Sequence, residues 1–237
     1  MAEAAPARLY LPALPAAGAR VELDGAEAHY VARVCRARAG ERLEATDGRG
    51  ACATLRLVEA RGAVLVEVEA VAHEPLARPA WLLCGAPEGE RADWLVEKLA
   101  ELGVARFQPV DTARGAWRRA AGRRERWERL AVAALRQSRR AHLMEVADPL
   151  PLERALRELP AGCARWLADA GGVALGGVVA GGGMPGTGLV GPSGGLEQAE
   201  RAAALAAGFL PVRLADARLR TETAALAWAA WWATGSA

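Results

Sequence analysis

Lysine is almost absent from this sequence of 237 residues, because Lys98 is its only lysine and arginine supplies the remaining basic side chains. Histidine occurs three times, and tyrosine and phenylalanine occur twice each. Alanine, glycine and arginine are all abundant, so the number of arginines reflects a compositional bias. Their clustering is more informative, since the planar guanidinium suits bidentate contacts to phosphate and stacking on bases.

Closely spaced cysteines and long apolar runs are also missing. No two of the four cysteines are spaced as Cys-x-x-Cys, which argues against a zinc knuckle or a dithiol site and favours buried thiols in a reducing compartment. Residues 1–15 lack the basic segment and apolar core of a signal peptide. The most apolar stretch, 224–233, is shorter than the roughly 20 residues that a membrane span needs. These absences predict a soluble cytoplasmic protein without a membrane partner.

Short β-like segments make up the N-terminal third of the chain. Apolar and polar residues alternate with period two in 51–58 and 63–71, as they do in half-buried strands. Segments 8–11 and 41–46 are further candidate strands, and 27–33 is a candidate helix. Several short strands joined by tight turns predict a small β-barrel.

A basic cluster accompanies these strands, and it consists of Arg33, Arg36, Arg38, Arg42 and Arg49. On a small barrel such a cluster can follow a nucleic-acid backbone. A solvated surface balanced by Glu41 and Glu44 explains it equally well, so composition leaves both interpretations open.

The remainder of the chain predicts an α/β domain. A connector bounded by prolines, 73–79, places the domain boundary so that residues 1–73 form the barrel and 74–237 the second domain. A wholly apolar strand at 81–86, buried on both faces as in parallel sheets, a helix at 90–102 and a strand at 104–110 then form a right-handed βαβ unit. Further helices are expected at 126–139, 149–159 and 197–207, and further strands at 165–168, 188–190 and 210–212.

A strongly basic run covers residues 114–140. Within it only Glu125 and Glu128 oppose the arginines, which include Arg118, Arg119, Arg123, Arg124, Arg126, Arg129, Arg136, Arg139 and Arg140. The helix expected at 126–139 has an apolar stripe, so its charged face is a candidate for phosphate contacts.

Two loop signals near the C-terminus point to a ligand site. Gly191-Pro192-Ser193-Gly194-Gly195 and the segment 214–223 each follow a short apolar strand. Neighbouring strand ends with exposed backbone form the ligand crevice of open α/β sheets, and 169–172 would be a first loop of the same crevice. The glycine-rich segment 176–188, with Gly181, Gly182 and Gly183, lacks the Gly-Lys-Ser/Thr of a phosphate loop and is interpreted as a surface connector.

Several segments, taken in order, resemble one known family. They are His29-Tyr30-Val31-Ala32-Arg33-Val34-Cys35-Arg36, Asp47-Gly48-Arg49-Gly50, Gly89-Glu90-Arg91-Ala92-Asp93-Trp94, Glu101-Leu102-Gly103-Val104, Gly191 to Gly195, and Leu219-Arg220-Thr221-Glu222-Thr223-Ala224. This pattern is similar to that of the RsmE-type 16S ribosomal RNA (uracil-N3)-methyltransferases of the SPOUT superfamily. The resemblance implies a PUA-like β-barrel that contacts RNA, followed by an α/β domain with a trefoil knot. It also implies a homodimer that binds S-adenosylmethionine in three knot loops and acts on small-subunit ribosomal RNA or the 30S subunit, without a metal.

The resemblance also implies site residues. The cofactor-binding candidates are Ala168, Gly191, Pro192, Gly194, Gly195, Leu214, Ala215, Leu219, Arg220 and Thr221. The RNA-binding candidates are Arg33, Arg36, Arg38, Arg126 and Arg140. Methylation of uracil N3 requires loss of the imide proton, which positive charge near the carbonyl oxygens assists. Arg8 and Arg220 are therefore the catalytic candidates, and no residue is assigned as the general base.

The chain departs from the family pattern at five positions. Ser193 replaces a glutamate, Ala215 a glycine and Ala217 an arginine, with Arg218 one position later; Arg139 replaces a glycine and Met144 a proline. Two alternatives therefore stay open. One is a SPOUT methyltransferase with another RNA target, such as transfer RNA, and the other is an RNA-binding ribosome-assembly factor with impaired catalysis.

Overall fold

The structure, a computed structural model, describes residues 6–23, 25–60, 62–117, 122–178 and 184–235. The chain divides into two compact units. Unit 1 comprises Met1–Leu76 and Leu135–Leu143, and unit 2 comprises Ala77–Ala134 and Met144–Ala237. Each unit is built around its own sheet.

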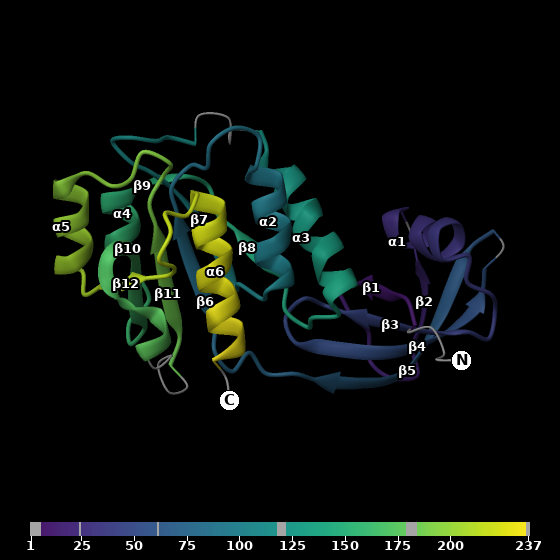
Figure 1. Cartoon of the computed structure of the whole chain (residues 1–237). Helices are drawn as coiled ribbons and strands as arrows, with labels where there is room; N and C mark the ends of the chain where they lie inside the picture. Colours follow the sequence, from purple (N-terminus) through teal and green to yellow (C-terminus); the bar gives the residue numbers. More distant parts are fainter. Residues whose placement is uncertain (1–5, 24, 61, 118–121, 179–183, 236–237) are drawn as a thin grey trace. The chain divides into compact units, whose positions relative to one another are not determined.

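Unit 1 is a curled five-stranded sheet with the order β1-β3-β4-β5-β2 (Figure 1). Its elements are β1 (Arg8–Tyr10), β2 (Arg20–Leu23), α1 (Gly25–His29), the π-helix η1 (Tyr30–Cys35), β3 (Arg42–Thr46), β4 (Ala51–Glu59) and β5 (Val64–His73). The period-two pattern has the expected consequence, because Leu55 and Leu57 of β4 and Val66 and Val68 of β5 are buried in one core. Among the described residues no pairing joins β1 to β2, so the predicted barrel is a half-barrel.

The helical part of unit 1 differs from the prediction of a single short helix at 27–33. The chain forms α1 and then continues as η1, where the backbone N–H of Arg36 bonds to the carbonyl of Val31. Arg36 has φ 51°, in the left-handed region, and this conformation ends the π-helix. Strand β2 was not predicted from the sequence, because it is an edge strand with only two apolar residues.

The segment Leu135–Leu143 packs against the turn between β3 and β4. The N–H of Gly50 donates to the carbonyl of Ala141 (3.1 Å), and the N–H of Leu143 donates to the carbonyl of Gly48 (2.9 Å). Arg139 has φ 59°, a conformation that favours glycine, which is the residue the family pattern has there. Its guanidinium bonds to Glu44 and to the carbonyl of Pro6 (3.0 Å), so the substitution adds contacts within unit 1.

Unit 2 is a seven-stranded parallel sheet with the order β12-β10-β11-β6-β7-β8, and β9 pairs with β7. Its elements are β6 (Ala80–Cys84), α2 (Ala92–Glu101), β7 (Arg106–Asp111), α3 (Arg124–Ser138), β8 (Glu145–Val146), β9 (Leu150–Pro151), α4 (Leu152–Arg157), β10 (Ala164–Ala174), the 3₁₀-helix η2 (Leu175–Gly177), β11 (Gly186–Val190), α5 (Gln198–Ala206), β12 (Leu210–Arg213) and α6 (Thr221–Thr234). The last four residues of α3 belong to unit 1. The helix expected at 149–159 is shorter, because its first residues form β9.

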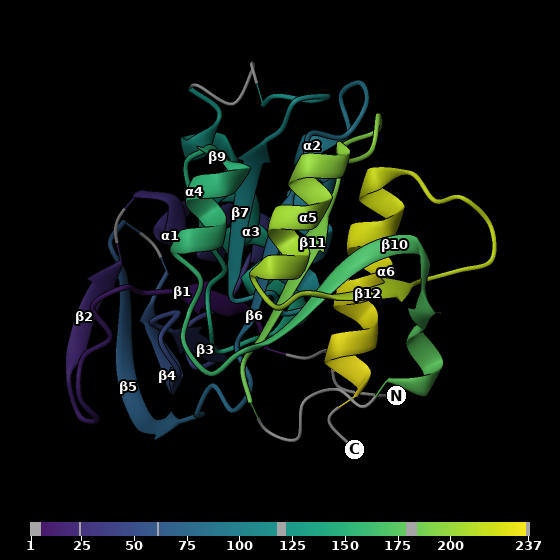
Figure 2. The ribbon, with the colours of Figure 1, turned by 90° about the vertical axis from the view of Figure 1, so that its left-hand side faces the viewer.

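Helices cover both faces of this sheet. Helices α4 and α5 lie in front of the strands in Figure 2. Leu152 of α4 and Ala204 of α5 form one buried cluster with Leu83 and Leu189 of the sheet. Helix α6 packs against β11 and β6 on the opposite face. Alternation along β11 turns Gly188 to that face, where an added Cβ would lie 2.5 Å from the indole of Trp228. The glycine thus allows the tryptophan to pack directly on the strand.

Helix α5 begins with a capping box, and its loss should have a measurable cost. The Glu197 side chain accepts from the N–H of Glu200, and Glu200 Oε2 accepts from the N–H of Glu197 (2.8 Å). We expect Glu197→Ala to lower the free energy of unfolding by about 1 kcal/mol, as the loss of other N-caps does. Urea titration followed by circular dichroism would measure this change. Gln198→Ala, the next position and also exposed, is the control; an equal loss in both variants would contradict a capping role.

Candidate functional site

A pocket of about 530 Å³ lies in unit 2, beside the middle of β10 and at the carboxyl ends of β11 and β12. It is lined by residues 167–170 of β10, by residues of the segments that follow β11 and β12, and by the first turn of α6. The ends of β11 and β12 therefore form the predicted crevice, and β10 contributes from within the strand. Its volume is typical of pockets for small molecules and cofactors.

Nine of the ten predicted cofactor-binding residues line this pocket: Ala168, Gly191, Pro192, Gly195, Leu214, Ala215, Leu219, Arg220 and Thr221. The tenth, Gly194, is not among the lining residues, and its carbonyl instead accepts a bond from Arg114 Nη1 (3.3 Å). Arg220 precedes the first residue of α6 with an exposed side chain. Within the described part of the chain its guanidinium has no hydrogen bond or ion pair.

The loop 191–195 is held from three sides. A Cβ on Gly115 would lie 2.6 Å from Cβ of Pro192, and one on Gly85 would clash with the backbone nitrogen of the same proline. Thr221 Oγ1 donates to the carbonyl of Gly191 (3.1 Å), which joins this loop to the start of α6. Helix α6 itself begins without a side-chain cap.

The loop expected at 169–172 lies inside β10. The register between β10 and β12 shifts between Ala168 and Val173, so the four intervening residues leave the ladder. Asp169 accepts bonds from the N–H of Gly171 (2.8 Å) and from Arg201 Nε (2.6 Å). Burial acts to raise the pKa of Asp169, but these bonds and the charge of Arg201 hold it below its ordinary value. A carboxylate therefore lines the pocket at neutral pH.

Departures from the family pattern leave this pocket intact. Ser193 is exposed, and its carbonyl accepts from Arg218 Nη2 (3.4 Å). Ala215 has no positive φ, so its Cβ introduces no backbone strain where the family has glycine. Arg218 lines the pocket beside Ala217, one position later than the family's arginine.

Three charged pocket residues lie outside the segments predicted to form the crevice: Glu88, Arg201 and Arg213. Asp169 and Glu222 lie inside the predicted segments 169–172 and 214–223, but neither was a predicted site residue. Glu222 is 1% exposed and accepts a bond from Arg91 Nη1 (2.5 Å). Its position directly after Arg220 and Thr221, both predicted site residues, was the sequence signal that could have identified Glu222 as a pocket residue. Arg201 lies on α5, far in the sequence from the loop it contacts, and no motif marks it.

Arg8 and four of the five predicted RNA-binding residues belong to unit 1, whereas the pocket belongs to unit 2. Arg33, Arg36 and Arg38 are exposed, in η1 and directly after it. Arg140 is half-buried, and burial lowers its pKa against the opposing effect of Glu74.

Arg8 is buried, with an exposed fraction of 8%. Its Nη1 donates to the carbonyl of Arg139 and its Nη2 to Cys52 Sγ (2.9 Å). Its Nε has no partner among the described residues. These contacts fix Arg8 within unit 1.

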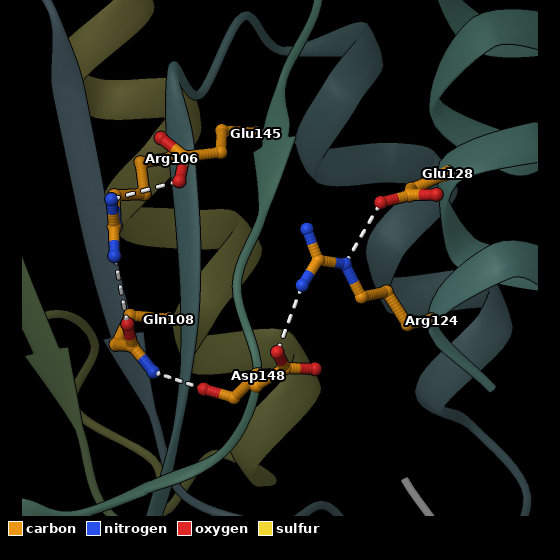
Figure 3. Close-up of polar contacts among 6 residues, drawn as sticks. All are labelled: Arg106, Gln108, Arg124, Glu128, Glu145 and Asp148. Atoms are coloured by element: carbon orange, nitrogen blue, oxygen red, sulfur yellow. Dashed lines mark hydrogen bonds and ion pairs between the residues drawn. The ribbon is translucent and has the colours of Figure 1, made fainter. Parts of the chain in front are cut away.

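The basic run is more balanced than the sequence suggested. Arg124 bonds to Glu128 (2.9 Å) and Asp148 (2.8 Å), and Figure 3 shows Asp148 also joined through its backbone to Gln108 of β7. Hydrogen bonding to Glu128, with the charges of both carboxylates, raises the pKa of Arg124. Arg126, a predicted RNA-binding residue, pairs with Asp93 (2.6 Å).

Glu125 and Glu128 are the only acidic residues within the run, but they are not the only carboxylates that oppose it. The fold brings five more to it from other segments: Glu27, Glu44, Asp93, Asp148 and Glu197. Arg118 and Arg119 lie outside the described residues.

Among the described residues no group of three or more histidine, cysteine, aspartate or glutamate side chains could hold a metal ion. A search of the same residues finds no helix long and apolar enough to cross a membrane.

Comparison with known families agrees with the two-unit organisation. A profile described as "RNA methyltransferase domain" matches residues 74–233, and one described as "RNA methyltransferase PUA domain" matches residues 23–69. The fold, its pocket and these two matches thus define an RNA methyltransferase with a PUA domain before the methyltransferase domain.

Individual relatives narrow this class. The chain is 33% identical over 227 residues to the ribosomal RNA small subunit methyltransferase E of Mycobacterium bovis, covering 91% of this chain and 87% of the relative. The crystal structure of a ribosomal RNA small subunit methyltransferase E from Neisseria gonorrhoeae, bound to S-adenosyl methionine, superposes with a TM-score of 0.86 at 30% identity over 95% of both chains. A putative methyltransferase from Legionella pneumophila, in complex with the same cofactor, has a TM-score of 0.82 at 26% identity over 96% of both chains. The chain belongs to the family of ribosomal RNA small subunit methyltransferase E.

Proposed function

We propose that this protein transfers the methyl group of S-adenosylmethionine to N3 of a uridine in small-subunit ribosomal RNA. The observation that carries this proposal is the pocket of unit 2 that β10 and the segments after β11 and β12 line. It occurs in a fold that superposes over 95% of the chain on a relative crystallised with that cofactor.

The residues around the pocket fit the cofactor. Gly191 and Gly195 expose backbone groups to it, and Asp169 brings a carboxylate that suits a ligand with a sulfonium and an ammonium group. When bound, S-adenosylmethionine supplies an electrophilic methyl group. Because Pro192 is held by Gly85 and Gly115, the loop is ordered before any ligand binds, which lowers the entropic cost of binding.

Arg220 is our candidate for the residue that assists the nucleophile. Uracil N3 is nucleophilic only after its proton is lost, and the resulting negative charge spreads to the neighbouring carbonyl oxygens. A guanidinium in the pocket wall without an internal partner can stabilise that charge. N3 lies on the pairing edge of the base, so the target uridine must be unpaired or splayed out.

Several finer assignments belong to the same proposal. We infer that residues 1–73 form the RNA-binding domain, with Arg33, Arg36 and Arg38 on the RNA side, and that residues 74–237 form the catalytic domain. Arg140, which lies in the part of 74–237 that belongs to unit 1, is a further RNA-binding candidate. The part-exposed Trp231 of α6 suits a subunit interface, and a homodimer is our expectation. The cytoplasm, where ribosomal subunits are assembled, is the proposed location.

Calorimetry and RNA mass spectrometry together test the function. The purified protein should bind S-adenosylmethionine, and it should add one methyl group per molecule of unmethylated 30S subunit or its ribosomal RNA. Nuclease digestion and mass spectrometry should locate the group on N3 of one uridine. Failure to bind the cofactor with or without RNA would refute the enzyme assignment. Methylation of transfer RNA in place of ribosomal RNA would refute the substrate.

The backbone of Gly195 gives a sharper test of the loop. Its φ is +74°, and an added Cβ would meet no atom within 4 Å, so a larger side chain causes backbone strain rather than crowding. We expect Gly195→Val to weaken S-adenosylmethionine binding by at least about 10-fold, from a strain of roughly 1–3 kcal/mol. Gly195→Asn is the matched control, because asparagine tolerates the left-handed region. Equal affinities of the valine and wild-type proteins in calorimetry would remove the loop from the binding site.

A further inference from the structure

We propose that Arg91 binds the phosphate backbone of the RNA substrate at the rim of the pocket, and that Glu222 is the positioning residue that holds it there. This inference rests on the proposed function, since it assumes that the pocket holds the methyl donor and that RNA approaches from outside. It assigns a role in RNA binding to a residue of unit 2 that lies outside the basic cluster of unit 1.

The geometry of the pair is asymmetric. Glu222 is in the first turn of α6, is 1% exposed and forms part of the pocket wall. Arg91 immediately precedes α2, and its side chain is 49% exposed. Arg91 Nη1 donates to Glu222 Oε1 at 2.5 Å. One end of the pair is therefore fixed in the protein, and the other carries its remaining N–H donors in solvent.

A contribution to stability is a weak explanation for this arrangement. Burial of a carboxylate is costly, and its attraction to a guanidinium that is half in water repays only part of that cost. Burial raises the pKa of the Cys84 thiol, and the negative charge of Glu222 raises it further. What the pair does provide is one guanidinium held in a defined place beside the pocket.

The position of Arg91 favours RNA over the cofactor as its ligand. Arg91 is absent from the residues that line the pocket, although its partner Glu222 lines it. Exposed acidic residues in the same segment, Glu88 and Glu90, offset the charge of Arg91. General electrostatic attraction is therefore not the basis of the site. A fixed guanidinium fork with free donors is the chemistry that binds one phosphate group.

Two other arginines, unlike Arg91, bond to the loop 191–195. Arg114 bonds to the carbonyl of Gly194 (3.3 Å) and Arg218 bonds to the carbonyl of Ser193 (3.4 Å). These two guanidinium groups support the loop 191–195 through its backbone. Among the described residues no hydrogen bond or ion pair joins Arg91 to that loop, so its remaining donors are available to a ligand outside the pocket.

Arg91→Ala is the first test, with an oligonucleotide containing the target uridine as the probe. We expect RNA affinity to fall about 10- to 100-fold, the usual loss when one charged hydrogen-bond partner is removed. The slope of log affinity against log salt should become shallower by about 0.7, the value for one phosphate contact in a single strand. S-adenosylmethionine affinity should stay within about 2-fold. Arg154→Ala, an exposed arginine paired with Glu158 on α4, is the control and should change none of these values.

Glu222→Gln tests the positioning role and also guards against misfolding. Arg91→Ala leaves the buried carboxylate of Glu222 without its partner, and the single variant could unfold for that reason. The double variant Arg91→Ala/Glu222→Gln removes this buried charge, so the test remains valid even if the single variant unfolds. Glu222→Gln should reduce RNA affinity as Arg91→Ala does, and the double variant should be no worse than Arg91→Ala alone. Arg91→Lys should retain the salt slope and recover part of the affinity.

Three results would overturn the inference: unchanged RNA affinity in Arg91→Ala, reduced affinity with an unchanged salt slope, or additive losses in the double variant. Failure of the proposed function is separate, because it would show in the wild-type protein as absent cofactor binding or absent methyl transfer.

Discussion

Replacement of Arg220 by alanine should lower kcat for methyl transfer about 100- to 1000-fold, the loss seen when a preorganised donor to a developing anion is removed. The side chain is exposed and has no internal partner among the described residues, so its removal breaks no native contact. We expect the Tm to change by less than about 2 °C. Single-turnover transfer from labelled S-adenosylmethionine, with RNA and cofactor both saturating, would measure the chemical step.

Arg220→Lys serves as the matched variant. Lysine keeps the positive charge but presents a single ammonium in place of the fork, so activity should recover only partly. If Arg220→Ala lost its activity and its Tm also fell strongly, Arg220 would have a structural role. A reduced RNA affinity with an unchanged single-turnover rate would move Arg220 from the chemical step to substrate binding.

Gly188→Ala should strongly destabilise unit 2. The new Cβ would lie 2.5 Å from the indole of Trp228, which is 1% exposed and stacks at 6.0 Å on Trp232. Neither the strand nor the ring can move without disturbing the packing of α6. We expect the free energy of unfolding to fall by about 3 kcal/mol, at the upper end for overpacked cores. That loss corresponds to a Tm lowered by about 6–12 °C.

Differential scanning calorimetry would measure this change. Gly176→Ala is the control, because an added Cβ there meets nothing within 4 Å and the backbone needs no positive φ. A Tm for Gly188→Ala equal to that of the control would mean that α6 packs less closely on β11 than the structure indicates.

Much of the fold could be predicted because its signals are local. The apolar run that became β6 and the alternation in β4 and β5 each depend on burial of neighbouring side chains, so periodicity revealed them. The edge strand β2 was missed, since an exposed strand of four residues needs no such pattern. The π-helix η1 was also missed, because its bonding differs from that of an α-helix without a different composition.

In the pocket, too, only the features with a local sequence signal could be predicted. The glycines of 191–195 and the loop residues of 214–223, each after a short apolar strand, indicated the ends of two strands. What sequence could not provide was the set of contacts between distant segments: Gly85 and Gly115 against Pro192, Arg201 beside Asp169, and Arg91 on Glu222. The carboxylates that balance the basic run were missed for the same reason, since Asp93 and Asp148 lie outside it.

The place of α6 has a consequence for the time at which the protein becomes active. Thr221, Glu222 and Ala224 complete the pocket, and Trp228 covers the face of β11 that Gly188 leaves bare. Synthesis proceeds from the N-terminus, so these residues leave the ribosome after every strand of both sheets. Unit 1 can form its half-barrel early, apart from Leu135–Leu143, which begins within α3. A nascent chain should therefore bind the methyl donor only after α6 has emerged from the ribosome.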